Sequence, residues 1–285
     1  MSKNNQAAGK TFIFGEYTAL YGSPALILTT PPYFTLTTTP ANTLTSNIHP
    51  ESPAGKFIAA NIDFFQHLHV EFSDPYLPVG GFGASTAQFL LVYALKHPTI
   101  KDPKKLLLDY LEVAWDGTGN APSGADLMAQ YAGGITFFDK NKNILKSYPW
   151  PFPELEYGLI HTGNKIPTHT HLKKLPAFDR IALENIALHG INYFITANGT
   201  DWLESINHFA DALDAQQLVA EHTLLLLDKL AACPDILAKK GCGALGADVI
   251  LILFHKEKSA NVLHFLKKNH FHLIQHGMRV GNSAF

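Results

Sequence analysis

The chain has 285 residues, of which 46% are hydrophobic and 16% are charged, and its formal net charge is −2. This length allows one large domain or two ordinary ones, and the near balance of charge argues against a broad nucleic-acid-binding surface. Two cysteines cannot build a disulfide framework, and no apolar run is long enough to span a bilayer. The N-terminus is polar and lacks the apolar core of a signal peptide. We therefore expect a cytoplasmic globular protein that binds neither nucleic acid nor membrane.

The first half of the chain combines short strands with helices. Apolar or alternating patterns predict strands at residues 11–14, 25–28, 33–39, 69–72 and 135–138. Helical periodicity predicts helices at residues 54–68, 84–96 and 103–115, and one more that begins near Ser123 and ends at Gly133 and Gly134.

A proline-rich segment, Pro149–Pro153, divides the chain, because proline fits neither the interior of a helix nor a central strand. We place a domain boundary there, between residues 1–153 and 154–285. Beyond it, strands are predicted at residues 157–161, 248–254 and 270–275, and helices at residues 177–188, 201–213, 216–230 and 259–268. The pattern indicates the α+β class, arranged in two lobes.

Two glycine segments resemble nucleotide-binding motifs without satisfying them. Gly9-Lys10-Thr11 looks like the end of a P-loop, but Asn4 stands where that motif needs another glycine. Residues 241–246 spell G-x-G-x-x-G, but a strand follows them, and Leu266 stands where a dinucleotide site needs an acid. Taken alone, residues 241–246 indicate a glycine-rich turn.

A third glycine segment, Pro78–Ala87, leads directly into a predicted helix. Glycine permits a left-handed backbone, and a helix start offers unpaired N–H groups and the positive end of the helix dipole. This junction favours a phosphate ligand. The same residues resemble the nucleophile turn of a hydrolase with Ser85 as nucleophile, although that turn needs a strand immediately before it. A hydrolase is therefore kept as an alternative.

Four stretches carry a family resemblance: residues 9–26 (GKTFIFGEYTALYGSPAL), 78–87 (PVGGFGASTA), 122–126 (PSGAD) and 240–248 (KGCGALGAD). Taken in this order, they resemble the motifs of the GHMP kinase superfamily, and within it the mevalonate-pathway branch. The Gly-Glu-Tyr form at residues 15–17 is typical of phosphomevalonate kinases. A weaker fifth match, residues 161–168, resembles a segment near the acceptor site of these kinases.

The resemblance implies a two-lobed α+β fold, with an N-terminal lobe like domain 2 of ribosomal protein S5 and a ferredoxin-like C-terminal lobe. It implies ATP and Mg²⁺ as cofactors, with Asp126 as the catalytic base and Lys10 as its partner. The implied ATP contacts are Gly80, Gly81, Gly83, Ala84, Ser85, Thr86, Gly243 and Ala244. The implied substrate contacts are Lys10, Glu16, Tyr17, Lys165 and Thr168, and the implied Mg²⁺ ligands are Ser85 and Asp116.

Several positions depart from the family pattern. The phosphate loop is one residue shorter, and Ala84 stands at its first serine position. In the third motif, Cys242 replaces a hydroxyl residue, and Leu245 and Ala247 replace glycines whose lack of a Cβ permits close approach to phosphate. Two alternatives therefore stand beside an active kinase: a catalytically impaired nucleotide- or metabolite-binding homologue, and a diphosphomevalonate-decarboxylase-like lyase.

The leading hypothesis is an ATP-dependent kinase that acts on mevalonate or 5-phosphomevalonate in isoprenoid precursor synthesis, as a monomer or homodimer. Its substrate would be a small anionic metabolite, for which Lys10 and Lys165 are the candidate cations. Histidine pairs at residues 67 and 69, 169 and 171, and 270 and 272 raise a zinc site as a further alternative. Zinc would need these separated pairs to converge, and the sequence has no Cys/His signature.

Overall fold

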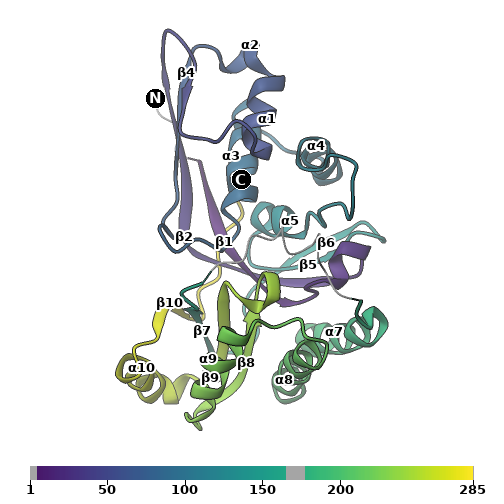
Figure 1. The fold of residues 1–285 in the computed structure, drawn as a ribbon, viewed down its shortest axis with the longest axis vertical. Coiled ribbons are helices and arrows are strands. Elements are labelled where there is room, and N and C mark those ends of the chain that lie inside the picture. The colour runs from purple at the N-terminus through teal and green to yellow at the C-terminus, as the bar shows by residue number, and fades with distance from the viewer. Residues whose placement is uncertain (1–4, 165–176, 285) are drawn as a thin grey trace.

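The computed structural model describes residues 5–164 and 177–284. Within these ranges the strands form two sheets, a six-stranded sheet in the first half of the chain and a four-stranded sheet in the second. Figure 1 shows the first sheet and its helices above, and the second sheet with its helices below. The helices in these ranges include none that is both long enough and apolar enough to cross a membrane.

The first sheet is built around one long strand, β2 (Ala25–Pro40). Antiparallel β1 (Asn5–Phe14) lies beside it, while β4 (Leu68–Ser73) pairs with its second half and β5 (Ile135–Asp139) with its first. The short strand β3 (Thr45–Ser46) and β6 (Ile144–Tyr148) complete the order β3-β4-β2-β5-β6. The two strands predicted at residues 25–28 and 33–39 are thus parts of a single strand.

Helices cover one face of this sheet (Figure 1). They are α1 (Pro53–Ala60), α2 (Ile62–Phe65), α3 (Ala84–Lys96), α4 (Pro103–Ala114) and α5 (Ala125–Ala132). The prediction of one helix over residues 54–68 is wrong, because the backbone of Asn61 leaves the helical region (φ −126°, ψ 36°) and separates α1 from α2. The predictions for α3 and α4 are confirmed almost to the residue.

The second sheet has the order β10-β7-β9-β8, and every neighbouring pair is antiparallel. Its strands are β7 (Leu155–His161), β8 (Ile236–Cys242), β9 (Val249–His255) and β10 (His272–Gly277). The helices α7 (Arg180–Ile195), α8 (Gly199–Ala215) and α9 (Glu221–Ala231) lie between β7 and β8 in the chain, and α10 (Ser259–Lys268) lies between β9 and β10. This connectivity and strand order are those of a ferredoxin-like unit, as the resemblance implies.

The sequence patterns do not predict β6 or β8. In β8, Lys239 and Lys240 interrupt the apolar pattern, yet the Lys240 side chain is completely buried. Three short 3₁₀ turns complete the described elements: η1 (Thr18–Tyr21), η2 (Ala244–Gly246) and η3 (Lys256–Lys258).

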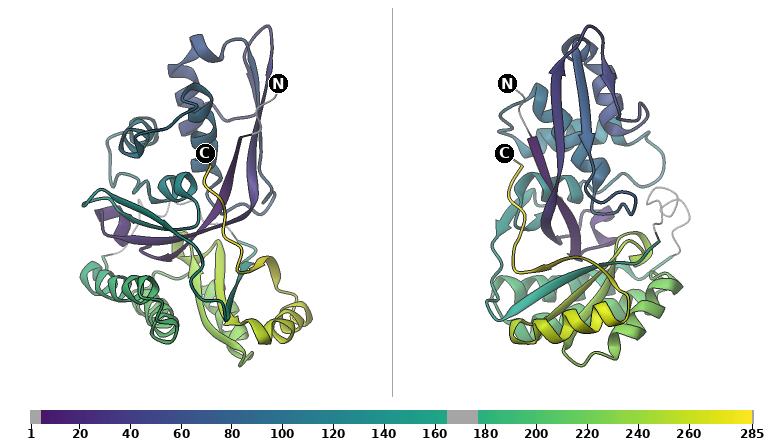
Figure 2. Two further views of the ribbon diagram at one scale, coloured as in Figure 1. Left: turned by 180° about the vertical axis from the view of Figure 1, so that it is seen from behind. Right: turned by 90° about the vertical axis from the view of Figure 1, so that its left-hand side faces the viewer.

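The two halves of the chain share a hydrophobic core. The rings of Phe14 on β1 and Phe209 on α8 lie 5.5 Å apart and belong to one cluster that includes residues of both sheets. The C-terminal segment then returns from the second sheet to the first (Figure 2). There, the backbone N–H of Gly281 donates to the Thr29 carbonyl (2.7 Å), and the Gly281 carbonyl accepts from the Gly134 N–H (2.7 Å). The boundary predicted after Pro153 falls between β6 and β7, although packing continues across it.

Candidate active site

An ion pair between Lys10 on β1 and Asp126 in the first turn of α5 lies near the junction of the two sheets. The Lys10 Nζ is 2.9 Å from the Asp126 Oδ2, and the side chains are 13% and 31% exposed. The other carboxylate oxygen, Oδ1, is shielded from solvent and accepts no hydrogen bond from the described residues. The structure thus brings together the two residues that the sequence suggests as catalytic partners.

The charge of Lys10 is stabilised by three carboxylates. Burial alone would lower the pKa of Lys10, but Asp126 first, and then Asp248 and Glu16, outweigh burial and raise it above 10.5. Lys10 is therefore an ammonium ion at neutral pH, as a group that stabilises developing negative charge must be.

Local sequence fixes the start of α5, and so the position of Asp126. Gly124 precedes the helix in the left-handed conformation (φ 76°), and the Ser123 hydroxyl accepts from the Ala125 N–H (3.2 Å). The methyl groups of Leu107 fill the space that a Cβ at Gly124 would need. A carboxylate in the first helical turn is also favoured by the helix dipole.

Gln130, one helical turn after Asp126, is buried and forms hydrogen bonds to three segments around the site. Its buried side-chain amide donates to the Ala8 carbonyl (2.9 Å) and the Gly83 carbonyl (3.2 Å), and accepts from the Thr86 hydroxyl (2.6 Å). It therefore connects β1, the glycine loop and α3. Sequence reasoning missed this residue, although its i, i+4 spacing from Asp126 on a predicted helix was a usable signal.

The glycine loop, residues 80–83, has four consecutive residues with positive φ: Gly80 (75°), Gly81 (80°), Phe82 (56°) and Gly83 (86°). The ring of Phe82 stacks on Tyr76 with centroids 4.2 Å apart, and its carbonyl accepts from the Lys10 N–H (2.9 Å). The helix α3 begins immediately afterwards, at Ala84. Because the first N–H groups of a helix have no intrahelical acceptor, this junction is a phosphate-binding geometry.

Three predicted ATP contacts at the start of α3 differ in what they can offer. Ala84 is half-buried and contributes its backbone, while Ser85 is exposed and presents its hydroxyl. Thr86 is buried, and its hydroxyl bonds inward to Gln130 and to the Gly83 carbonyl. The Thr86 side chain is therefore turned inward, and its predicted ATP contact stays a prediction that its backbone N–H would have to fulfil.

The hydrolase alternative loses its structural basis at the same place. A nucleophile turn needs a strand that runs directly into the nucleophile. Here β4 ends at Ser73, and turns separate that strand from Ser85.

Asp248, the last residue of the third glycine motif, lies next to the glycine loop. A Cβ on Gly243 would lie 2.6 Å from the Asp248 Oδ2, and a Cβ on Gly81 would lie 3.4 Å from the Asp248 Cβ. The half-buried Asp248 therefore stands between two loops that lie far apart in the sequence. Ala244, another predicted ATP contact, belongs to the η2 turn of the same motif.

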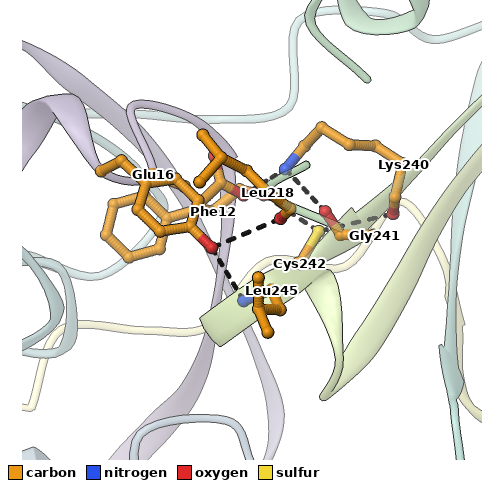
Figure 3. A network of polar contacts seen from close by, with 8 residues as sticks. Phe12, Glu16, Leu218, Lys240, Gly241, Cys242 and Leu245 are labelled. Carbon is orange, nitrogen blue, oxygen red and sulfur yellow. Dashed lines mark hydrogen bonds and ion pairs between the residues drawn. The ribbon is translucent and has the colours of Figure 1, made fainter. Parts of the chain in front are cut away.

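Glu16 and Tyr17, which the sequence predicts as substrate contacts, are used inside the protein. Glu16 is 7% exposed and forms an ion pair with the completely buried Lys240 (Figure 3). The buried Tyr17 hydroxyl donates to the Leu218 carbonyl (3.3 Å) and accepts from the Leu245 N–H (2.8 Å). These interactions hold the segment after β1 against β8 and η2, and the expected substrate contacts of Glu16 and Tyr17 stay predictions.

The two predicted metal ligands, Ser85 and Asp116, are both exposed. Asp116 lies in the exposed loop after α4, where its Oδ1 accepts from the Thr118 N–H (2.9 Å) and hydroxyl (2.6 Å). Within residues 5–164 and 177–284, no group of three or more His, Cys, Asp or Glu side chains could hold a metal ion. Two predicted substrate contacts, Lys165 and Thr168, lie outside the described residues.

A depression of about 390 Å³ lies away from this site, in the second half of the chain. It is lined by residues that include Glu154, Thr200, Glu204 and His255. None of the predicted site residues lines it.

No family model matches this chain, and no curated protein matches it in sequence. Solved structures match it closely in shape. The *Streptococcus pneumoniae* phosphomevalonate kinase in complex with phosphomevalonate and AMPPNP aligns with a TM-score of 0.81 at 16% identity, covering 97% of this chain and 100% of that one.

Two further structures align over nearly the whole chain. The *Methanococcus jannaschii* mevalonate kinase has a TM-score of 0.73 at 15% identity, covering 98% of both chains. The *Lactococcus lactis* galactokinase complexed with galactose has a TM-score of 0.74 at 10% identity, covering 99% of this chain and 94% of that one. The chain therefore has the fold of the GHMP kinases.

Proposed function

We propose that the protein is an ATP-dependent small-molecule kinase that transfers the γ-phosphoryl group of ATP to mevalonate or 5-phosphomevalonate. One observation carries this proposal: the Lys10–Asp126 ion pair lies directly beside a left-handed glycine loop that opens a helix. The loop supplies phosphate-binding N–H groups, and the ion pair supplies an acid–base pair for an acceptor hydroxyl.

In this proposal each group has a distinct task. The Asp126 Oδ1, which accepts no hydrogen bond from the described residues, takes the proton of the acceptor hydroxyl. Lys10 holds the other carboxylate oxygen and stabilises negative charge on the transferred group. Phosphoryl transfer depends mainly on positioning and charge neutralisation, and these residues supply both.

Magnesium fits this arrangement as an ion that arrives with the nucleotide. Mg²⁺ is commonly held by one or two protein oxygens together with substrate phosphates, so a preformed cluster of carboxylates is not required. The exposed Ser85 hydroxyl at the start of α3 is the described group that best fits as a ligand. When bound, Mg²⁺ supplies neutralisation of phosphate charge.

The choice of acceptor rests on two lines of support. The first is the Gly-Glu-Tyr form at residues 15–17, and the second is the similarity to a kinase solved with phosphomevalonate. The galactokinase aligns almost as well, so the fold alone does not choose the acceptor. Galactose therefore belongs in the test beside the two mevalonate compounds.

The test measures ADP release from Mg²⁺-ATP with mevalonate, 5-phosphomevalonate and galactose in turn. We expect turnover with one mevalonate compound, and its loss by about 100-fold or more in Asp126→Asn with ATP affinity retained. The matched control is Asp228→Asn, an exposed acid on α9, which should behave as wild type.

Four outcomes would contradict the proposal. Turnover with galactose alone would move the activity to a sugar kinase, and ATP binding without turnover on any acceptor would indicate an impaired homologue. ATP-dependent release of carbon dioxide from diphosphomevalonate would indicate a lyase. Full activity in Asp126→Asn would remove the proposed base.

A further inference from the structure

The segment that follows Lys10 is attached to the second sheet and the third glycine motif by successive polar contacts (Figure 3). The Phe12 carbonyl accepts from the Cys242 thiol (3.3 Å), and Glu16 pairs with Lys240. The Tyr17 hydroxyl then accepts from the Leu245 N–H. We call this set the interlobe clasp: Phe12, Glu16 and Tyr17 on one side, and Lys240, Cys242 and Leu245 on the other.

The ion pair between Glu16 and Lys240 at the centre of the clasp is buried, although removing two charges from water costs free energy. Lys240 is completely buried, donates also to the Gly241 carbonyl (3.2 Å), and lies 5.7 Å from the centroid of the Phe209 ring. The Glu16 Oε2 is buried and accepts no hydrogen bond from the described residues. A buried ion pair is seldom a net source of stability compared with apolar residues of similar size, so a role other than stability should be sought for it.

That role follows from the neighbours of the pair. Lys10, which is paired with Asp126, lies on β1 two residues before Phe12 of the clasp. Burial lowers the pKa of Lys10, while Asp126, Asp248 and, to a smaller extent, Glu16 raise it. The charges therefore alternate from α5 to β8: Asp126 negative, Lys10 positive, Glu16 negative and Lys240 positive. Lys10 lies on β1 of the first sheet and Lys240 on β8 of the second, so this series joins the proposed catalytic pair to the second half of the chain.

We propose that Glu16 and Lys240 are positioning residues, whose buried ion pair fixes Lys10 relative to Asp126 and to the third glycine motif. The proposal rests on the proposed kinase function for its catalytic readout only. The contacts of the clasp hold β1 and the segment after it against β8 and η2, and the Glu16 carboxylate adds to the field that Asp126 and Asp248 exert on the Lys10 ammonium. Lys240 is completely buried and does not reach a substrate; burial raises the pKa of Glu16, and Lys240 opposes that shift and holds the carboxylate in place.

The test compares single and double replacements. Lys240→Met leaves Glu16 as a buried carboxylate without its partner, so the urea midpoint of unfolding should fall clearly. The double variant Glu16→Met with Lys240→Met removes both charges and should recover most of this loss, because apolar pairs of similar size replace buried ion pairs well. We expect kcat of the double variant to stay about 10- to 100-fold below wild type, with ATP affinity unchanged.

A merely structural pair would give a different result. If the double variant recovered wild-type kcat together with its stability, the positioning role would be overturned. The matched control is Lys105→Met, which removes the exposed lysine of an ion pair with Asp109 on α4 and should change neither kcat nor the midpoint.

A second measurement does not depend on catalysis. The titration of the Lys10 Nζ, followed by ¹⁵N NMR and assigned with Lys10→Arg, should move to lower pH in Glu16→Gln, while Asp126 and Asp248 still face the lysine. An unchanged Lys10 titration would overturn the proposal, even in a protein that turned over no acceptor. Glu16→Gln keeps the shape of the side chain and an oxygen that can accept from the Lys240 ammonium, so it is the mildest replacement and supplies this measurement where the methionine variants fail to fold.

Discussion

Replacing Gly83 by alanine tests whether the glycine loop holds Lys10 in place. Gly83 has φ +86°, and an added Cβ would lie 2.9 Å from the Lys10 Cγ, 3.0 Å from its Cε and 3.1 Å from the Gln130 Nε2. Gly117 has nearly the same backbone, with φ +85°, but no atom lies within 4 Å of its added Cβ. Gly117→Ala is therefore a control for the backbone strain alone.

The unfolding free energies of the two variants should differ because only the Cβ added at Gly83 contacts Lys10. A left-handed alanine costs about 1–2 kcal/mol, partly offset by a less flexible unfolded chain, so each variant should lose about 1 kcal/mol from this source. Overpacking adds about 1–3 kcal/mol in Gly83→Ala only. Reaching an ordinary contact distance of 3.4 Å also pushes the lysine stem away by roughly 0.5 Å.

Displacement of this size matters for catalysis, because a misplacement of about 1 Å can cost about 100-fold in rate. We expect kcat to fall about 10- to 100-fold in Gly83→Ala and to stay unchanged in Gly117→Ala, as measured by ADP release beside urea denaturation. Equal losses of stability in the two variants, with full activity in Gly83→Ala, would refute this account of the loop.

Two further predictions concern the groups around Lys10. Burial lowers the pKa of Lys10, but Asp126 outweighs burial, so the pKa is higher in the folded than in the unfolded protein. The stabilisation that the charge of Lys10 contributes is therefore fully present below pH 10.5 and is lost as the pH rises through the folded-state pKa. The difference in unfolding free energy between wild type and Lys10→Met should accordingly hold at neutral pH and shrink only above pH 10.5, in urea denaturation over a pH series. Gln130→Leu should cost about 2–4 kcal/mol in urea denaturation, because it leaves the Thr86 hydroxyl and the Ala8 carbonyl without this partner, whereas the exposed Gln66→Leu should change stability by less than about 0.5 kcal/mol.

Local signals in the sequence located α3 and the glycine loop well. Three glycines followed by Ala84–Lys96 predict both a left-handed loop and the helix after it, since these depend on backbone freedom and helical periodicity within a short segment. The break at Asn61 was not foreseen, because the apolar spacing continues through it while the backbone does not. Hydrophobic periodicity indicates which face of a helix is buried, but it does not indicate where the backbone changes direction.

The roles of Glu16 and Tyr17 could not be read from the same local signals. Their partners, Lys240 and Leu245, lie more than 200 positions along the chain. A motif beside Lys10 that resembles a kinase motif suggests a ligand contact when these distant partners are unknown. The burial of Lys240 could not be predicted for a related reason. A lysine normally indicates an exposed position, and here its charge is paired with that of the distant Glu16.

The contacts of the interlobe clasp bear on the departures in the third motif. Leu245 replaces a glycine but keeps a left-handed backbone (φ 53°), and its N–H bonds to the Tyr17 hydroxyl. Cys242 replaces a hydroxyl residue, yet its thiol still donates to the Phe12 carbonyl; burial raises the pKa of that thiol to about 11, so it keeps its proton at neutral pH. Both altered positions therefore contact the first motif, which itself carries the Gly-Glu-Tyr form. The Leu245 bond uses a backbone N–H that a glycine would also supply, and the Cys242 thiol donates as a hydroxyl would, so neither replacement removes its contact with the first motif.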